Sequence, residues 1–141
     1  MPYQMMYSSE ATQPMTVAGL EEILDDARKG NEARNVTGAL ISVDGVFLQI
    51  IEGEKDVVRR LMASIASDTR HRSLKVFHEA EVDTRAFGSW RMADLNPTAE
   101  QMSQWAGLPG TATIGELLAE INDAPGAVSR ILVSILNTLA Q

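Results

Sequence analysis

Residues 36–53 read VTGALISVDGVFLQIIEG, two apolar runs joined by the Asp-Gly pair 44–45. An Asp-Gly pair tolerates the positive φ angles of a tight turn, so the segment predicts a β-hairpin. In its second strand, Gln49 shares one face with Phe47 and Ile51, because side chains alternate with a period of two. A buried amide without partners costs roughly 1 to 3 kcal/mol. Either the fold or a ligand must therefore hydrogen-bond Gln49.

The segments around the hairpin predict an α+β domain. We expect a strand over residues 3–9, a helix capped by Thr16, a second helix over 54–67, and strands over 73–82 and 90–95. This order is typical of the split βαβ, or ferredoxin-like, fold with one extra strand. We therefore expect a five-stranded mixed sheet with two helices on one face.

Three polar side chains fall on otherwise apolar faces of different elements. The first helix carries an apolar stripe whose next position is Asn31. Gln49 lies in the hairpin, and Tyr7 lies in the first strand. Asn31 and Gln49 can satisfy each other while Tyr7 packs as an ordinary aromatic residue. They can equally bind a planar ligand with ring carbonyls and an N–H, because amides donate and accept. The residues alone leave both interpretations open.

Basic residues gather near the end of the second helix. Arg70 and His71 follow that helix, and together with Lys75 they can hold a phosphate. The same residues can instead form a solvated cap that complements the helix dipole. Both interpretations stand at this point.

Composition excludes several classes of function. The net charge of −7 argues against a general nucleic-acid or anionic-membrane binder. The chain has no cysteine and two histidines on different elements, so no metal site is expected. It shows no glycine-rich phosphate loop and no nucleophile beside a base. Without a membrane-span pattern or signal peptide, a cytoplasmic protein is expected.

The composition changes at residue 96. Short helical segments and turn residues follow, and residues 125–141 predict a helix with one apolar face. That face consists of Val128, Ile131, Leu132, Ile135, Leu136 and Leu139. We expect a domain over 1–95 and a helical extension over 96–141. The extension should pack on the open face of the sheet, and any apolar remainder should form a homo-oligomer or dock a partner protein.

Five motifs occur in a fixed order: MMYSS, ILDDARKGNEARNVTGAL, GVFLQIIEG, VVRRLMASIASDTRH and FGSWRM. In this order and at these separations they resemble the BLUF family of flavin-binding blue-light sensors. The resemblance covers about two thirds of the chain. It departs from the commonest pattern at Gly30, where some relatives have asparagine, and at Arg72, where a second histidine is frequent.

The resemblance implies a photochemical site. FAD would lie between the two helices, with FMN as the alternative cofactor. Tyr7 would match the redox-active tyrosine, Gln49 the switching glutamine, and Asn31 the amide that holds the flavin carbonyl and ring N–H. Light would move an electron and a proton from Tyr7, and their return would leave the Gln49 amide rotated or tautomerised.

The resemblance also implies which residues lie near the phosphate end of the flavin and which residues transmit the signal. Arg70 and His71 would lie near the ribityl and phosphate groups, and Trp90 and Met92 would be the mobile pair of the last strand. No cyclase or phosphodiesterase domain follows, so the chain is similar to the short, stand-alone members. We expect a sensor that is not an enzyme and that signals to a downstream effector protein. The alternatives are a small flavin oxidoreductase, an acylphosphatase-like hydrolase and a cofactor-free interaction domain.

Overall fold

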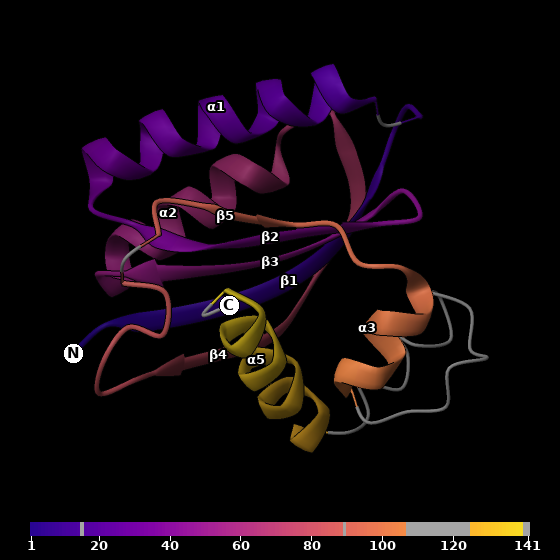
Figure 1. The fold of residues 1–141 in the computed structure, drawn as a ribbon. Helices are drawn as coiled ribbons and strands as arrows, with labels where there is room; N and C mark the ends of the chain where they lie inside the picture. Colours follow the sequence, from indigo (N-terminus) through magenta and orange to yellow (C-terminus); the bar gives the residue numbers. More distant parts are fainter. Residues whose placement is uncertain (15, 89, 107–124, 140–141) are drawn as a thin grey trace. The chain divides into compact units, whose positions relative to one another are not determined.

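The computed structural model describes residues 1–14, 16–88, 90–106 and 125–139 (Figure 1). The chain divides into two compact units, Met1–Leu95 and Asn96–Gln141. The elements of the first unit are β1 (Tyr3–Ala11), α1 (Val17–Arg34), β2 (Thr37–Val43), β3 (Val46–Gly53), α2 (Lys55–Ala66), β4 (His71–Glu81) and β5 (Ala93–Leu95). Those described in the second unit are α3 (Ala99–Ala106) and α5 (Pro125–Leu139).

The first unit is built on one five-stranded sheet of order β4-β1-β3-β2-β5. β1 pairs antiparallel with β3 and β4, and β2 pairs antiparallel with β3. β5 lies parallel to β2 at the edge of the sheet. α1 and α2 lie over the same face of this sheet (Figure 1). The expected ferredoxin-like fold with one extra strand is confirmed.

Local sequence accounts for where these elements begin and end. The hydroxyl of Thr16 accepts a hydrogen bond from Gly19 N at 3.0 Å and caps α1, as expected. α1 ends at Asn35, which adopts a left-handed conformation with φ 55°. Asp44 (φ 49°) and Gly45 (φ 77°) form the predicted tight turn between β2 and β3.

A hydrophobic core fills the space between the helices and the sheet. Its buried members are Tyr3, Met5, Tyr7, Leu24, Val36, Leu40, Phe47, Ile51, Val58, Met62 and Met92. The alternation predicted for β3 is therefore correct, because Phe47 and Ile51 face the helices. β2 and β3 approach closely at Gly38, where a Cβ would lie only 1.9 Å from the carbonyl oxygen of Ile50. Only glycine fits at that position.

Three strands differ from the sequence prediction by two or more residues at one end. β1 extends to Ala11, two residues beyond the predicted end. β4 begins at His71, two residues before the predicted start. β5 contains only Ala93–Leu95, so Trp90 and Met92 precede the strand rather than lying in it. Side chains of α1 hydrogen-bond the carbonyls of Arg91 and Met92. Those contacts take the place of a longer ladder.

In the second unit, α5 confirms the helix predicted near the end of the chain. α3 and α5 contact each other. One of the expected short helical segments, residues 114–122, lies outside the described residues. Packing of the extension on the sheet stays a prediction. Among helices in the described part of the chain, none has the length and apolar character to cross a membrane.

Candidate ligand-binding site

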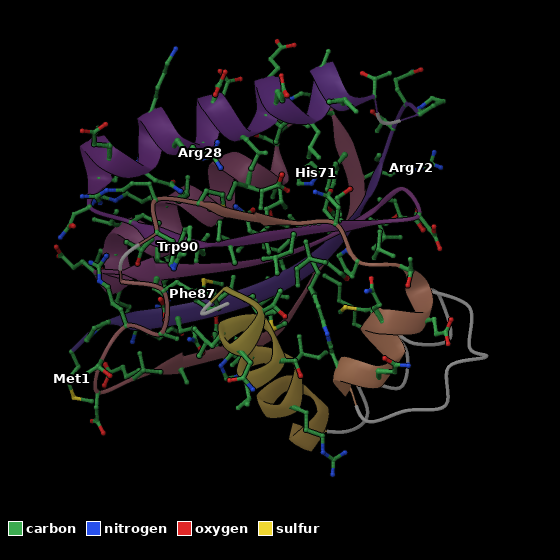
Figure 2. The ribbon with its side chains drawn as sticks, in the orientation of Figure 1. Met1, Arg28, His71, Arg72, Phe87 and Trp90 are labelled. Atoms are coloured by element: carbon green, nitrogen blue, oxygen red, sulfur yellow. The ribbon has the colours of Figure 1, made fainter. Side chains whose placement is uncertain are left out.

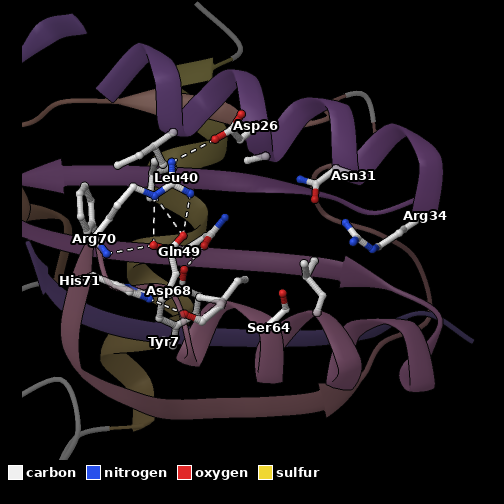
Figure 3. A pocket seen from close by; sticks show the side chains of 15 residues that line it. Tyr7, Asp26, Asn31, Arg34, Leu40, Gln49, Ser64, Asp68, Arg70 and His71 are labelled. Atoms are coloured by element: carbon white, nitrogen blue, oxygen red, sulfur yellow. Dashed lines mark hydrogen bonds and ion pairs between the residues drawn. The ribbon is translucent and has the colours of Figure 1, made fainter. Parts of the chain in front are cut away.

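A cavity of about 210 Å³ lies between α1, α2 and the helix-facing side of the sheet (Figure 3). Fifteen residues line it. Among them are five of the six residues that the sequence singled out for ligand binding: Tyr7, Asn31, Gln49, Arg70 and His71. Lys75, the sixth, does not line the cavity. The structure therefore brings together side chains from β1, α1, β3, β4 and the loop before β4.

Tyr7 and Gln49 are direct cross-strand neighbours in the register of β1 and β3. The Tyr7 hydroxyl donates a hydrogen bond to Oε1 of Gln49. Burial raises the pKa of the Tyr7 phenol, and the nearby negative charge of Asp68 raises it further. The phenol therefore keeps its proton at neutral pH. A protonated donor is in place at the oxygen of the Gln49 amide.

The nitrogen of the same amide has a different neighbour. Nε2 of Gln49 lies 3.4 Å from the sulfur of Met92, a distance suited to a weak hydrogen bond to a thioether. The fold thus supplies partners for both ends of Gln49. Neither partner is Asn31, so the interpretation in which the two amides satisfy each other is wrong.

Asn31 is 2% exposed and lines the cavity from α1. Its Nδ2 donates to the carbonyl oxygen of Arg91 at 2.7 Å. Within the described residues, the Asn31 amide oxygen accepts no hydrogen bond. A buried acceptor without a donor is costly, so this oxygen offers a ligand N–H a favourable position.

Arg70 spans the space between α1 and the loop before β4. Its guanidinium binds Asp68 at 2.6 Å and Asp26 at 3.1 Å (Figure 3). The hydrogen bond from Arg70 is the main cause that lowers the pKa of the Asp68 carboxyl. Asp26 is exposed but ion-paired. The positive charge of Arg70 is therefore shared by two carboxylates at the cavity.

His71 connects the cavity wall to two neighbouring elements. Its Nδ1 lies 2.7 Å from the Ser9 hydroxyl, and its Nε2 is hydrogen-bonded to the Ile65 carbonyl. The His71 and Tyr7 rings meet edge to face, with centroids 6.3 Å apart. His71 therefore packs against Tyr7 and also lines the cavity.

Trp90 and Met92 are not equivalent. Met92 is 2% exposed and contacts Gln49, whereas Trp90 is 41% exposed and does not line the cavity. Of the pair, the structure brings only Met92 to the site. The photochemical role of either residue stays a prediction.

Sequence reasoning missed four polar residues of the cavity wall: Asp26, Arg34, Ser64 and Asp68. Helical spacing contained a signal for two of them. Asp26 lies three residues after Ile23, and Arg34 lies three after Asn31, so both border the same face of α1. Asp68 is the first residue of the DTRH motif, in which only Arg70 and His71 were assigned to the site.

A ferredoxin-like domain with a ligand cavity between two helices and the sheet is the class of protein that these features define. Residues 3–93 match the family described as BLUF, sensors of blue-light using FAD. The match covers more than half of the chain. The chain belongs to the BLUF family.

Relatives with this domain include much larger proteins. Photoactivated adenylate cyclase subunit beta of Euglena gracilis is 36% identical over 111 residues, which cover 72% of this chain and 13% of that protein. Subunit alpha of the same organism is 36% identical over 98 residues, or 70% and 9% of the two chains. The chain thus spans about a tenth of the length of these relatives.

Solved structures share the fold. The photo-activated state of BlsA superposes with a TM-score of 0.79 at 24% identity, covering 96% of this chain and 95% of that one. The BLUF protein BlrB in its dark state gives 0.76 at 20% identity, with 97% and 96% covered. A bacterial light-regulated adenylyl cyclase gives 0.69 at 26% identity, covering 92% of this chain and 36% of that one.

Proposed function

We propose that this chain is a blue-light receptor that binds a flavin non-covalently and signals by a rearranged hydrogen bond. The observation that carries the proposal is the buried pair of Tyr7 and Gln49 at the wall of one cavity. A protonated phenol bonded to an amide is a donor poised to pass a proton. Family membership supports the same function.

The residues of the cavity fit an isoalloxazine ring. The amides of Asn31 and Gln49 offer donors and acceptors to ring carbonyls and an N–H, and the free acceptor of Asn31 favours an N–H. Arg70 and His71 would bind the ribityl and phosphate end. The family description favours FAD over FMN as the cofactor.

A bound oxidised flavin would supply blue-light absorption and a strong oxidant in its excited state. Tyr7 would then give up an electron, and its phenolic proton would move from Oη to Oε1 of Gln49. When both return to Tyr7, the Gln49 amide would remain rotated or tautomerised. The rearranged amide would present a different group to Met92, which lies beside it.

The change at Met92 would pass to the rest of the protein. Residues 1–95 would form the flavin-binding part and residues 96–141 the extension that carries the output. The relatives named as light-regulated cyclases support a role in controlling an effector. In this protein the target would be a separate cytoplasmic effector or a second copy of the chain, with no catalysis by the sensor itself.

A light-minus-dark absorption spectrum of the purified protein tests the proposal. We expect a yellow protein whose absorption shifts slightly to the red under blue light and returns in the dark. A bleached spectrum typical of reduced flavin, or reduction by nicotinamide in the dark, would instead indicate an oxidoreductase. A colourless protein would favour a hydrolase or an interaction domain.

A further inference from the structure

A second buried polar cluster lies on the sheet face opposite the cavity. Its centre is Glu52, which is 0% exposed and pairs with Gln4 across β3 and β1. One carboxylate oxygen of Glu52 accepts from Gln4 Nε2 and from Ala86 N, both at 2.8 Å. The other accepts from Phe87 N at 2.7 Å. One carboxylate therefore holds three donors from two parts of the chain.

Ala86 and Phe87 begin segment 86–92, the second part of the connection between β4 and β5. Figure 2 labels Phe87 and Trp90 in this segment. Phe87 is fully buried, and its carbonyl oxygen accepts from Trp90 N at 2.9 Å. Three residues further along the segment, the carbonyl oxygen of Trp90 accepts from Gly38 N of β2 at 3.1 Å. The start of segment 86–92 is thus tied to Glu52 and its middle to β2.

The end of segment 86–92 is tied to α1. The Arg28 guanidinium donates to the Met92 carbonyl oxygen at 3.0 and 3.2 Å, and Asn31 donates to that of Arg91. These contacts present the Met92 sulfur to Gln49. A displacement at Glu52 has a short path to that contact, because Phe87, which bonds Glu52, also bonds Trp90, and Trp90 lies two residues before Met92.

We propose that Glu52 is a positioning residue: it fixes the start of segment 86–92 so that Met92 is held against Gln49. The optical readout of this proposal rests on the proposed light-sensing function, whereas the anchoring itself does not. Glu52 is not among the described residues that line the cavity. It acts through Met92.

Position 52 requires a carboxylate, because three N–H donors share its two oxygens. The amide of a Glu52→Gln variant has one acceptor oxygen, and its nitrogen would face an N–H group. Gln4 can turn its own amide to adapt, but the backbone N–H groups of Ala86 and Phe87 cannot become acceptors. Whichever way the new amide points, one of these two N–H groups loses its partner.

Hydrogen exchange in the dark tests the anchoring without light. In Glu52→Gln, exchange at the Gly38 amide, which bonds Trp90, should accelerate by about tenfold, the loss expected for one net hydrogen bond. The Val36 amide, which bonds the Asn31 carbonyl in α1, should exchange at the wild-type rate. Equal acceleration at both amides, or none at Gly38, would overturn the proposal.

The photocycle supplies the second measurement. Glu52→Gln should keep the flavin and the red shift but change the rate of dark recovery several-fold. In a Met92→Leu background the same substitution should have little further effect, because coupled residues are not additive. Fully additive effects would show that Glu52 does not act through Met92.

The matched control is Gln4→Met, which removes one donor to Glu52 and leaves the bonds to Ala86 and Phe87. It should leave both Gly38 exchange and recovery unchanged, and a change equal to that of Glu52→Gln would contradict the proposal. If Glu52→Gln does not fold, Glu52→Asp gives the same comparison with both oxygens on a shorter side chain. If the wild-type protein shows no red shift, the light-sensing proposal is wrong. The hydrogen-exchange measurement would still test whether Glu52 anchors segment 86–92.

Discussion

The sulfur of Met92 lies 3.4 Å from the side-chain nitrogen of Gln49. The oxygen of the same amide accepts from Tyr7, so Gln49 is held between a phenol on β1 and a thioether in the segment before β5. Rotation of this amide would exchange its donor and acceptor ends and break both contacts. Each prediction below follows from that arrangement or from its surroundings.

Replacement of Gln49 by leucine should separate cofactor binding from the light response. An apolar side chain of similar size can pack among Leu40 and Phe47 but cannot rearrange a hydrogen bond. We expect Gln49→Leu to bind flavin and to lose the red shift. A normal shift in this variant, measured by light-minus-dark absorption, would show that the switch lies in another residue.

Tyr7→Phe should also retain flavin, because it removes only the hydroxyl from a packed ring. The variant lacks the proton that Tyr7 donates to Gln49, so the photocycle should be abolished or diverted to a different product. Transient absorption after a blue pulse measures this outcome. Recovery of the wild-type signal would exclude Tyr7 as the proton donor.

Substitutions at Met92 and at Trp90 should differ in their effect on the rate of dark recovery. Met92→Leu keeps the volume of the side chain but removes the sulfur acceptor, so dark recovery should change by about two- to tenfold, as for one weak hydrogen bond. Trp90→Phe is the matched control, since Trp90 is 41% exposed and outside the cavity. A larger effect from Trp90→Phe would reverse the assignment.

The raised pKa of Tyr7 predicts how stability depends on alkaline pH. The unfolded chain releases this proton near pH 10, whereas burial keeps it bound in the folded protein to higher pH. Above about pH 10 the folded state therefore holds more protons, and the free energy of unfolding falls as the pH rises through this window. Denaturant titrations should show a shallower fall for Tyr7→Phe. Identical slopes for the two proteins would contradict the shifted pKa.

Local pattern was sufficient to predict much of the site. A period of two placed Tyr7 and Gln49 on apolar strand faces, and the helical stripe that ends at Asn31 placed a third polar group toward the same core. These signals are short-range, because they depend only on how side chains alternate along one element. The Asp-Gly turn likewise needed no information from beyond the hairpin.

Long-range contacts could not be predicted in that way. Arg28 bonds the Met92 carbonyl across 64 positions, and Glu52 bonds Phe87 across 35. Glu52 looks like an ordinary polar residue at a strand end until the topology brings the connection between β4 and β5 against it. The resemblance to a family supplied roles for Met92 and Gln49, but their contact required the fold.

The extension beyond residue 95 should transmit the light signal by binding an effector protein or a second copy of the chain. In α5, Ile131 and Ile135 of the predicted apolar face are buried, whereas Val133 is 57% exposed. Burial of a large apolar side chain is worth roughly 1.5 to 3 kcal/mol, so covering the exposed part of α5 would favour association. Every described residue that lines the cavity precedes residue 96, so deletion of residues 126–141 should preserve the red shift. The same deletion should change the oligomeric mass or abolish binding of an effector. Light scattering and light-dependent binding assays on the wild type and the truncation provide the comparison. If both properties survive the deletion, the output surface lies within residues 1–125.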